Sequence, residues 1–410
     1  MTTDLDTRVI SEIAPDVPNT PEGILAAARA AAPELAKRRE EIEQARRLPP
    51  DIVELVRSTG VFRMGFSAEY GGPDLTSVQQ TEVIEALAYG DTATGWCAMI
   101  GMDTGIYAGY LERSAAQEIM PHIDMITAGL IFPAGKARRV EGGYRLSGRW
   151  GFGSGITHAD LVIAGAFIVD ADGKPENGPN GVPATRVFFL TPDQVTIEDT
   201  WYTTGLRGSG SNHYNIDDVF VPERRAYSFG KALSRSGPMS MPDAIVRNMP
   251  GVPLGTMRAA LDYARAEIGR RTVPTTGQPW HDNYRIQRIL GECEMEYQGI
   301  RNSVYGSLNH QWERLSRPGA TLDDLSADER ISTMLPRLNA FRVARQVITK
   351  LYDLLGTSSI YAPSPMDRWL RDVNTMCTHI VVGDHIIQSA GAHLLGGTPE
   401  FPFALGIVED

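Results

Sequence analysis

Residues 146–169 read LSGRWGFGSGITHADLVIAGAFIV and carry the clearest sign of β structure in the chain. Its second half, Leu161–Val169, is the longest uninterrupted apolar run in the chain. The run has about half the length that a membrane-spanning helix needs, so we predict a buried strand. The first half is rich in Gly and Ser, which is typical of turns beside strands. The middle of the chain is therefore predicted to be a β region.

The β region extends from about residue 125 to about residue 230, and helical sequence lies on both sides of it. Gly, Thr and Val are frequent within it, and apolar residues alternate with polar ones. The predicted strands are Arg139–Leu146, Leu161–Val169, Arg186–Leu190 and Tyr214–Val221. The order of the elements is therefore helices, strands and helices.

Apolar residues three or four positions apart predict amphipathic helices in residues 22–120 and from residue 243 onward. Residues 49–51 mark the start of one helix and Gly60 its end, while Pro33 is expected in a first helical turn. The longest stripe consists of Ile286, Ile289, Leu290, Cys293, Tyr297, Ile300, Val304 and Leu308. Long helices of this kind normally pack as an antiparallel bundle.

The composition is that of an ordinary globular protein of two to three domains. The 410 residues include 39 Lys and Arg against 50 Asp and Glu, a formal net charge of −11. This acidic balance argues against nucleic acid as a partner, because a phosphate backbone needs clustered positive charge. The cysteines Cys97, Cys293 and Cys377 lie far apart, so neither a disulfide framework nor a zinc ribbon is visible. No signal-peptide or membrane-spanning pattern is visible, and we expect a cytoplasmic protein.

The motifs of several large enzyme classes are missing. The sequence contains no GxxxxGK[ST], HExxH or GxSxG pattern. Residues 208–213, GSGSNH, begin like a dinucleotide fingerprint, but His213 occupies the third glycine position and a β pattern follows. His379, His385 and His393 do not share a face at metal-ligand spacing, so no metal is proposed. If this chain handles electrons, they must come from a second protein or from the substrate.

Two Gly- and Ser-rich stretches, residues 150–160 and 201–211, are candidates for ligand binding. Glycine lets a backbone approach a flat ligand, and neighbouring hydroxyls supply hydrogen bonds. The alternative is that both stretches are tight turns between strands. Near the C-terminus, Asp372, Thr375 and His379 are spaced to share one helical face. His379 is then either a base or a partly buried histidine bonded to a neighbouring acid.

Four segments together resemble the acyl-CoA dehydrogenase superfamily. They are residues 48–72 with the turn Glu69-Tyr70-Gly71-Gly72, residues 146–159, the strand 218–222 (DVFVP) and the helix 367–372 (DRWLRD). The resemblance implies an α+β fold with an N-terminal α-helical domain (1–124), a middle β-barrel or sandwich domain (125–235) and a C-terminal four-helix bundle (236–410).

Within that superfamily the residues point away from dehydrogenation. The dehydrogenases use a glutamate a dozen or so residues after the Arg-Asp pair to remove the α-proton of the substrate, and Val382 aligns there, beside Val381. A valine cannot accept a proton. The sequence is more similar to the two-component flavin-dependent monooxygenases of the 4-hydroxyphenylacetate hydroxylase oxygenase type, which share the Gly95-Trp96 pair, residues 148–159 and the turn 205–211.

The resemblance to these monooxygenases implies roles for individual residues. His379 and Ser154 would be catalytic, with Ser154 bonded to the flavin near N5. The other cofactor contacts would be Trp96, Ile156, Ser211, the phosphate-binding Arg271, and, beside a neighbouring subunit's cofactor, Ser358 and Ser359. Where phenol hydroxylases of this group have a histidine, this chain has Thr104 next to Asp103. These two residues and His158 are the candidate substrate contacts.

The implied protein is an oxygenase component that uses reduced FMN or FAD and O2 through a C4a-hydroperoxyflavin. Ser154 would hydrogen-bond this species, and His379 would move a proton, a role worth about 10²–10⁴-fold. The resemblance also implies a separate NAD(P)H-dependent flavin reductase and a homotetramer. Hydroxylation of an aromatic or polyketide-like molecule and N-oxygenation of an amine both stay open, because Thr104 departs from the phenol hydroxylases. Two alternatives are an acyl-CoA dehydrogenase- or oxidase-like flavoenzyme and a non-catalytic flavin-binding protein.

Overall fold

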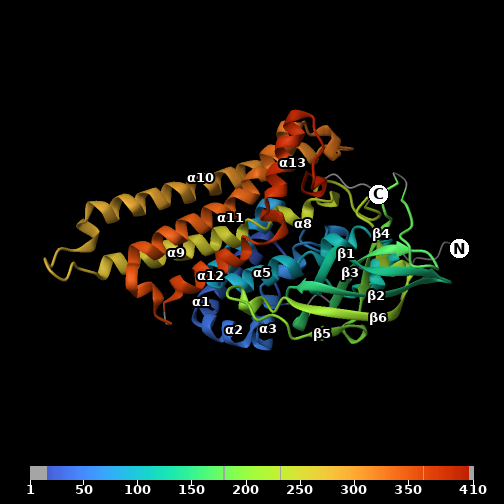
Figure 1. Cartoon of the computed structure of the whole chain (residues 1–410), viewed down its shortest axis with the longest axis horizontal. Coiled ribbons are helices and arrows are strands. Elements are labelled where there is room, and N and C mark those ends of the chain that lie inside the picture. Colours follow the sequence, from blue (N-terminus) through green and yellow to red (C-terminus); the bar gives the residue numbers. More distant parts are fainter. Residues whose placement is uncertain (1–15, 179–180, 231, 363, 406–410) are drawn as a thin grey trace.

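Helices occupy both ends of the chain and strands its middle (Figure 1). The structure, a computed structural model, describes residues 16–178, 181–230, 232–362 and 364–405. The α+β class predicted from the sequence is confirmed. None of the helices in these ranges combines the length and the apolar character that a membrane crossing requires. The domain limits at residues 124/125 and 235/236 stay a prediction.

The elements follow one another in three groups. The helices before the sheet are α1 (Pro21–Lys37), α2 (Arg39–Ala45), α3 (Pro50–Ser58), α4 (Ser77–Gly90), α5 (Thr92–Gly101), α6 (Thr104–Ala108) and α7 (Arg113–Ile119). The strands are β1 (Thr127–Val140), β2 (Gly143–Gly153), β3 (Leu161–Val169), β4 (Thr185–Leu190), β5 (Thr196–Glu198), β6 (Asn212–Pro222) and β7 (Ala226–Tyr227). The later helices are α8 (Ala244–Arg247), α9 (Gly251–Arg270), α10 (Tyr284–Leu315), α11 (Ala327–Leu355), α12 (Pro365–Met376) and α13 (Asp384–Leu395).

The strands form one mixed sheet in the order β5-β6-β2-β1-β3-β4-β7, in which only the β1–β3 pair is parallel among the described strands. Strand β3 coincides with the predicted apolar strand, and β4 and β6 lie within two residues of their predicted limits. The strand predicted over 139–146 is wrong. Glu141 and Gly142 form the turn between β1 and β2 there, and Gly142 has the positive φ of 76° that this turn requires.

The predicted helical stripes are the buried faces of the bundle. Along α10, the predicted stripe residues that are buried are Ile286, Cys293, Tyr297, Ile300, Val304 and Leu308, while Ile289 and Leu290 are partly buried. The predicted ending near Gly60 is also confirmed, because α3 ends at Ser58 and Gly60 follows with φ of 80°. The prediction for Pro33 is wrong, since α1 begins at Pro21, behind a Thr20 cap, and continues through Pro33. Buried Ala28, Ala32 and Leu35 hold that helix in place on both sides of the proline.

The arrangement leaves a seam between the sheet and the helices. One hydrophobic cluster runs through helices from both ends of the chain, and a second lies within the sheet. Helix α5 lies between the bundle and the sheet (Figure 1). Side chains from the first and last thirds of the sequence therefore meet the strands at this seam, where the candidate site is found.

Candidate active site

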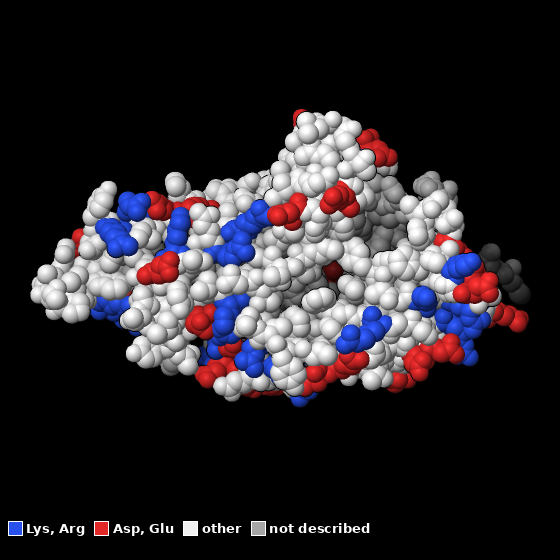
Figure 2. Space-filling model, in the orientation of Figure 1, with Lys and Arg blue, Asp and Glu red and all other residues white. Residues whose placement is uncertain are grey.

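A cavity of about 590 Å³ opens at the seam between the sheet and the helices. Figure 2 shows it as a hollow near the centre of the face, with an acidic atom visible at depth. Most lining side chains are apolar, as is typical of small-molecule sites. The polar ones are Asp103, Tyr107, Ser154, Ser211, Thr375, Thr378 and His379.

Trp96 is held at the cavity wall by the way α5 begins and packs. The Asp91 carboxylate caps the helix, because its Oδ1 accepts a hydrogen bond from the Thr94 N–H at 2.8 Å. A Cβ on Gly95 would lie 2.6 Å from Cβ of Ala88 in α4, so only glycine permits this close packing. Helix α5 is thereby fixed against α4, and the Trp96 indole, 4% exposed, reaches Ser154.

Four side chains form one hydrogen-bonded chain along the wall. Trp96 Nε1 donates to Ser154 Oγ at 3.1 Å, and the Ser154 and Ser211 hydroxyls lie 2.7 Å apart. The Ser211 and Ser209 hydroxyls are also 2.7 Å apart, and Ser209 donates to the Leu206 carbonyl at 2.7 Å. Each hydroxyl has a single proton, so Ser211 must donate to Ser209 and Ser154 to Ser211. Ser154 Oγ therefore keeps one lone pair for a donor in the cavity.

The turn that carries Ser209 and Ser211 is fixed against α12. A Cβ on Gly205 would lie 2.1 Å from the Arg371 carbonyl oxygen, so this close approach requires glycine. The next residue, Leu206, donates its N–H to Asp372 Oδ1 at 2.7 Å. Burial raises the pKa of Asp372 to about 7, and the Leu206 N–H acts in the opposite direction. The Arg-Asp pair of the family motif thus positions the serine-rich turn.

His379 faces Trp96 from the turn that follows α12. The helix ends at Met376, so the predicted helical face shared by Asp372 and His379 does not form. The His379 and Trp96 rings meet edge to face with centroids 5.3 Å apart. The Val381 N–H donates to His379 Nδ1 at 3.4 Å, which leaves the Nε2 proton available. Burial lowers the pKa of His379 to about 4, so the imidazole is uncharged at neutral pH.

The cavity brings together several of the residues predicted for the site. Those that line it are Trp96, Asp103, Ser154, Ser211 and His379. They come from α5, the turn after it, the turn that follows β2, the 201–211 turn and the segment after α12. Their separate roles stay predictions.

Three other predicted residues do not line this cavity. The Thr104 hydroxyl donates to the Gly101 carbonyl at 2.8 Å and lies 3.0 Å from the Thr127 hydroxyl. Ile156 is buried in the hydrophobic cluster of the sheet. Burial, together with nearby Arg57, lowers the pKa of His158 to about 4.

Arg271, Ser358 and Ser359 gather near the opposite end of α12 from His379. The Leu355 carbonyl accepts hydrogen bonds from Ser358 Oγ at 2.9 Å and from Arg271 Nη1 at 3.3 Å, and Ser359 Oγ donates to the Tyr352 carbonyl at 3.0 Å. Helix α12 has 12 residues. It therefore separates this group from the cavity of its own chain by about 18 Å.

Sequence reasoning did not single out most of the cavity lining, including Tyr107 and Phe152. Tyr107 continues the helical spacing of Trp96, Ile100 and Asp103, all of which line the cavity. That spacing was the signal available. Phe152 is 64% exposed and has φ of 61°, a strained backbone conformation at the rim of the site. The Gly- and Ser-rich stretch 150–160 contains it, but nothing in that stretch singled out this residue.

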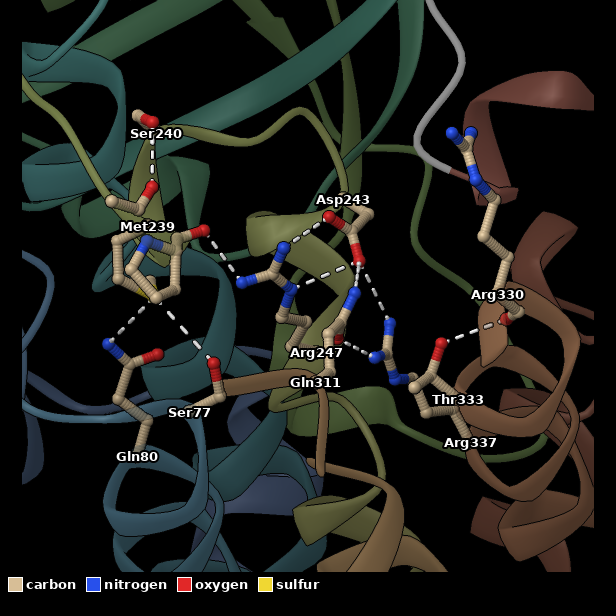
Figure 3. A network of polar contacts seen from close by, with 12 residues as sticks. Ser77, Gln80, Met239, Ser240, Asp243, Arg247, Gln311, Arg330, Thr333 and Arg337 are labelled. Carbon is tan, nitrogen blue, oxygen red and sulfur yellow. Dashed lines mark hydrogen bonds and ion pairs between the residues drawn. The ribbon is translucent and has the colours of Figure 1, made fainter. Parts of the chain in front are cut away.

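Ile245, Val246 and Met249 form one wall of the cavity. A buried ionic network supports this wall (Figure 3). Asp243 Oδ2 is 3.0 Å from Arg247 Nε and 3.2 Å from Arg337 Nη1. Although burial opposes it, Arg247 and Arg337 hold the pKa of Asp243 below its usual range. The network joins the segment before α8 to α11.

Comparison with known proteins gives a consistent result. Two family models match the chain: Acyl-CoA dehydrogenase, N-terminal domain, over residues 23–129, and Acyl-CoA dehydrogenase, C-terminal domain, over residues 250–383. The indole-3-acetate monooxygenase of Pseudomonas putida is 29% identical over 363 residues, 88% of this chain and 90% of the relative. The FADH(2)-dependent resorcinol hydroxylase, oxygenase component, of Rhizobium sp. (strain MTP-10005) is 26% identical over 383 residues, 88% and 91% of the two chains. XiaF from Streptomyces sp., solved in complex with FADH2 and glycerol, has a TM-score of 0.84 at 23% identity and covers 93% of this chain and 96% of its own.

Proposed function

Because this chain belongs to the acyl-CoA dehydrogenase superfamily and is a flavin-dependent monooxygenase, we propose that it uses reduced flavin to add one oxygen atom from O2 to a small molecule in this cavity. The resemblance found in the sequence is confirmed. The observation that carries the proposal is the meeting of Trp96, Ser154 and His379 in one largely apolar cavity. The products are those left open above, an aromatic or polyketide-like alcohol or an N-oxygenated amine.

The cavity residues fit a reduced flavin. Such a ring presents an N–H at N5, and Ser154 has one lone pair free for a donor because its proton is committed to Ser211. The Trp96 ring would pack beside the flavin, and the apolar lining would exclude water. When bound, the reduced flavin supplies the electrons that activate O2. FMN and FAD present the same ring to this wall.

His379 is suited to hold or move one proton at Nε2. Its Nδ1 already accepts a hydrogen bond from Val381, and the ring is uncharged at neutral pH. In this tautomer the neutral imidazole donates its Nε2–H to a reacting oxygen, and it can take a substrate proton at Nε2 only when the ring proton moves to Nδ1, which breaks the 3.4 Å contact with the Val381 N–H. We therefore assign general acid–base catalysis to His379.

The acyl-CoA dehydrogenase alternative needs an ionised carboxylate in the cavity. Val381 lines the cavity and Val382 is buried, at the positions where the dehydrogenases have their glutamate. The acidic residue of the described lining is Asp103. Burial raises the pKa of Asp103 well above its usual range and so disfavours the ionised carboxylate. It is therefore a poor source of the required base.

The proposed activity is tested by supplying reduced FMN or reduced FAD and isotopically labelled O2 with a panel of aromatic, polyketide-like and amine compounds. The expected result is a product that gains one labelled oxygen atom, detected by mass spectrometry. Reduction of the bound oxidised flavin by an acyl-CoA without air would instead support the dehydrogenase alternative.

Ser154→Ala is expected to lower the amount of product formed per reduced flavin about tenfold and to raise hydrogen peroxide release in proportion. The physical reason is the loss of one hydrogen bond at the reacting ring, in a cavity where water does not replace it. Product and peroxide are quantified in the same reaction. Ser58→Ala, which removes an exposed hydroxyl on α3, is the matched control and should leave the ratio unchanged. An unchanged ratio in Ser154→Ala would contradict the assigned role.

The partners follow from the same proposal. The relatives are named oxygenase components or subunits, which implies a separate reductase component. We propose that an NAD(P)H-dependent flavin reductase supplies the reduced flavin, that the protein works in the cytoplasm, and that it is a homotetramer. The group of Arg271, Ser358 and Ser359 would then contact the flavin of a neighbouring subunit. Ile360 and Tyr361, 62% and 68% exposed, lie next to this group in sequence and suit a subunit contact.

Arg271→Gln is expected to weaken the binding of reduced FMN about 10–100-fold, because a charge-assisted hydrogen bond to phosphate is lost. Anaerobic titration of the purified oligomer measures this affinity. Arg270→Gln is the matched control, since the adjacent Arg270 side chain is 71% exposed. Its polar contacts within the described chain, a 3.5 Å ion pair with Glu267 and a 3.2 Å hydrogen bond to the Ala266 carbonyl, stay on its own helix. Equal affinities of the two variants would exclude Arg271 as a phosphate contact.

A further inference from the structure

The hydrogen-bonded serine chain ends on a group that can only accept. Ser209 Oγ donates to the Leu206 carbonyl at 2.7 Å, and the indole Nε1 of Trp201 donates to the same oxygen at 2.9 Å. A carbonyl oxygen has no proton to give, so the direction of the Ser209 hydroxyl is fixed. Each hydroxyl before it in the chain must then point the same way, from Ser154 through Ser211 to Ser209.

The backbone of the turn keeps this end of the chain in place. Leu206 has a positive φ of 50°, which is uncommon for a leucine. Its N–H donates to the buried Asp372 on α12 at 2.7 Å, and the preceding Gly205 packs against the backbone of that helix. Such a conformation persists only where the surrounding contacts hold it. The carbonyl that ends the serine chain is therefore preorganised.

Ser209 lies behind the cavity wall. It is 1% exposed and is not among the described residues that line the cavity. Ser154 and Ser211 do line it, and Ser154 also accepts the indole N–H of Trp96 at 3.1 Å. With its proton committed to Ser211, Ser154 Oγ can offer a ligand only a lone pair. Ser209 therefore acts on the cavity through the other two hydroxyls.

An acceptor at this position distinguishes the reduced from the oxidised form of a flavin. Reduced flavin carries a proton at N5 and is a hydrogen-bond donor there, whereas the N5 of oxidised flavin has only a lone pair. Two acceptors that face each other in an apolar cavity both lack a partner, which costs free energy because water does not replace the missing bond. The Ser154 hydroxyl would not discriminate in this way if its proton were free to turn toward N5.

We propose, on the basis of the function proposed above, that Ser209 and Ser211 are positioning residues that keep Ser154 a hydrogen-bond acceptor, so that the site binds reduced flavin in preference to oxidised flavin. Oxidised flavin is the form that remains after each oxygenation. Weak binding of that form lets reduced flavin from a separate reductase replace it. The serine chain thus sets which redox form occupies the cavity.

The test measures the affinity of the full-length protein for reduced FMN, in an anaerobic titration, and for oxidised FMN. We expect reduced FMN to bind about 10–100-fold more tightly, the effect of one hydrogen bond gained or denied in a buried site. The same preference raises the reduction potential of bound FMN by about 30 mV for each factor of ten, because two electrons are transferred. Neither measurement needs turnover. Equal binding of both forms would overturn this inference alone, whereas binding of neither would overturn the proposed function as well.

Variants separate orientation of the hydroxyls from structural support. Ser209→Ala frees the protons of Ser211 and Ser154 to turn toward the cavity. It should therefore weaken the binding of reduced FMN, strengthen that of oxidised FMN and lower the ratio of the two affinities about tenfold. Ser209→Thr keeps a hydroxyl and should retain the wild-type ratio. Ser211→Ala removes the next hydroxyl and should lower the ratio in the same way, which keeps the test available if Ser209→Ala does not fold.

Thr203→Val is the matched control for these variants. The Thr203 hydroxyl lies in the same turn, but it donates to the Gly205 carbonyl at 2.9 Å and is not part of the serine chain. Its removal should leave the ratio of the two affinities at the wild-type value. An equal loss of affinity for both forms of FMN in Ser209→Ala, or an unchanged ratio in both alanine variants, would overturn the proposal.

Discussion

His379→Ala is expected to lower product formation about 10²–10⁴-fold at pH 7, because it removes the group that holds and moves a proton beside the reacting atoms. Affinity for reduced flavin should change little, since Trp96 and the serine chain remain in place. The ratio of product to peroxide and the rate of product formation are the measurements. This is the largest effect on activity that the structure predicts.

The pH dependence of the reaction rate is expected to follow the protonation of His379. Burial lowers the pKa of His379 to about 4, so the ring is neutral at pH 7 and gains its proton only as the pH falls toward 4. The wild-type rate should therefore show no step near pH 6.5, where an exposed histidine titrates, and should fall only in acid. His379→Ala should lack that acid limb.

His310→Ala is the control for both measurements. The His310 side chain is 47% exposed on α10, is paired with Glu329 and is not among the described residues that line the cavity. Its loss should leave rate and pH profile unchanged. A His379→Ala variant that keeps its activity within about threefold, or a wild-type step near pH 6.5, would show that His379 is not the proton-transfer group.

Asp243→Ala is expected to lower the free energy of unfolding by about 3–5 kcal/mol, the largest effect on stability. It leaves the buried guanidinium groups of Arg247 and Arg337 without their negative partner (Figure 3). It also removes the acceptor of a 3.0 Å hydrogen bond from Gln311 Nε2. Denaturant unfolding followed by tryptophan fluorescence measures the change.

Two further variants make the stability test specific. Asp262→Ala breaks a partly exposed pair with Arg258 on α9 and should cost only about 0–1 kcal/mol. Asp243→Asn keeps a hydrogen-bonding side chain of the same size and should fall between the two. If Asp243→Ala cost no more than Asp262→Ala, the network would not be what supports the Ile245–Met249 wall of the cavity.

Some motif residues could be recognised in the sequence because their immediate surroundings require that residue type. Gly95 is needed where α5 packs on α4, and Gly205 where the serine-rich turn meets α12. Both glycines belong to motifs that were recognised in the sequence before their packing was known. At both glycines the residue type itself is the constraint. The catalytic roles of His379 and Ser154 came instead from the resemblance to the flavin-dependent monooxygenases, because residue type and spacing alone left His379 either a base or a buried histidine.

Other features depended on where helices stop and on which surfaces meet. Because α12 ends at Met376, His379 lies opposite Trp96 and does not share a helical face with Asp372. The orientation of each hydroxyl in the serine chain follows from the Leu206 carbonyl that ends it. The part that Ser209 plays behind the cavity wall can be recognised only when every hydrogen bond of that chain is known.

Short-range patterns were thus sufficient for the α+β order, the apolar strand β3, the buried stripes of the bundle and the family. Periodicity and residue type act within a few neighbours, so the sequence displays them directly. The cavity could be seen only in the tertiary structure, because its walls join residues that are far apart in the chain. Trp96 contacts Ser154, Ser154 contacts Ser211, and Leu206 contacts Asp372. Such contacts depend on the packing of whole helices against a sheet, which no local pattern encodes.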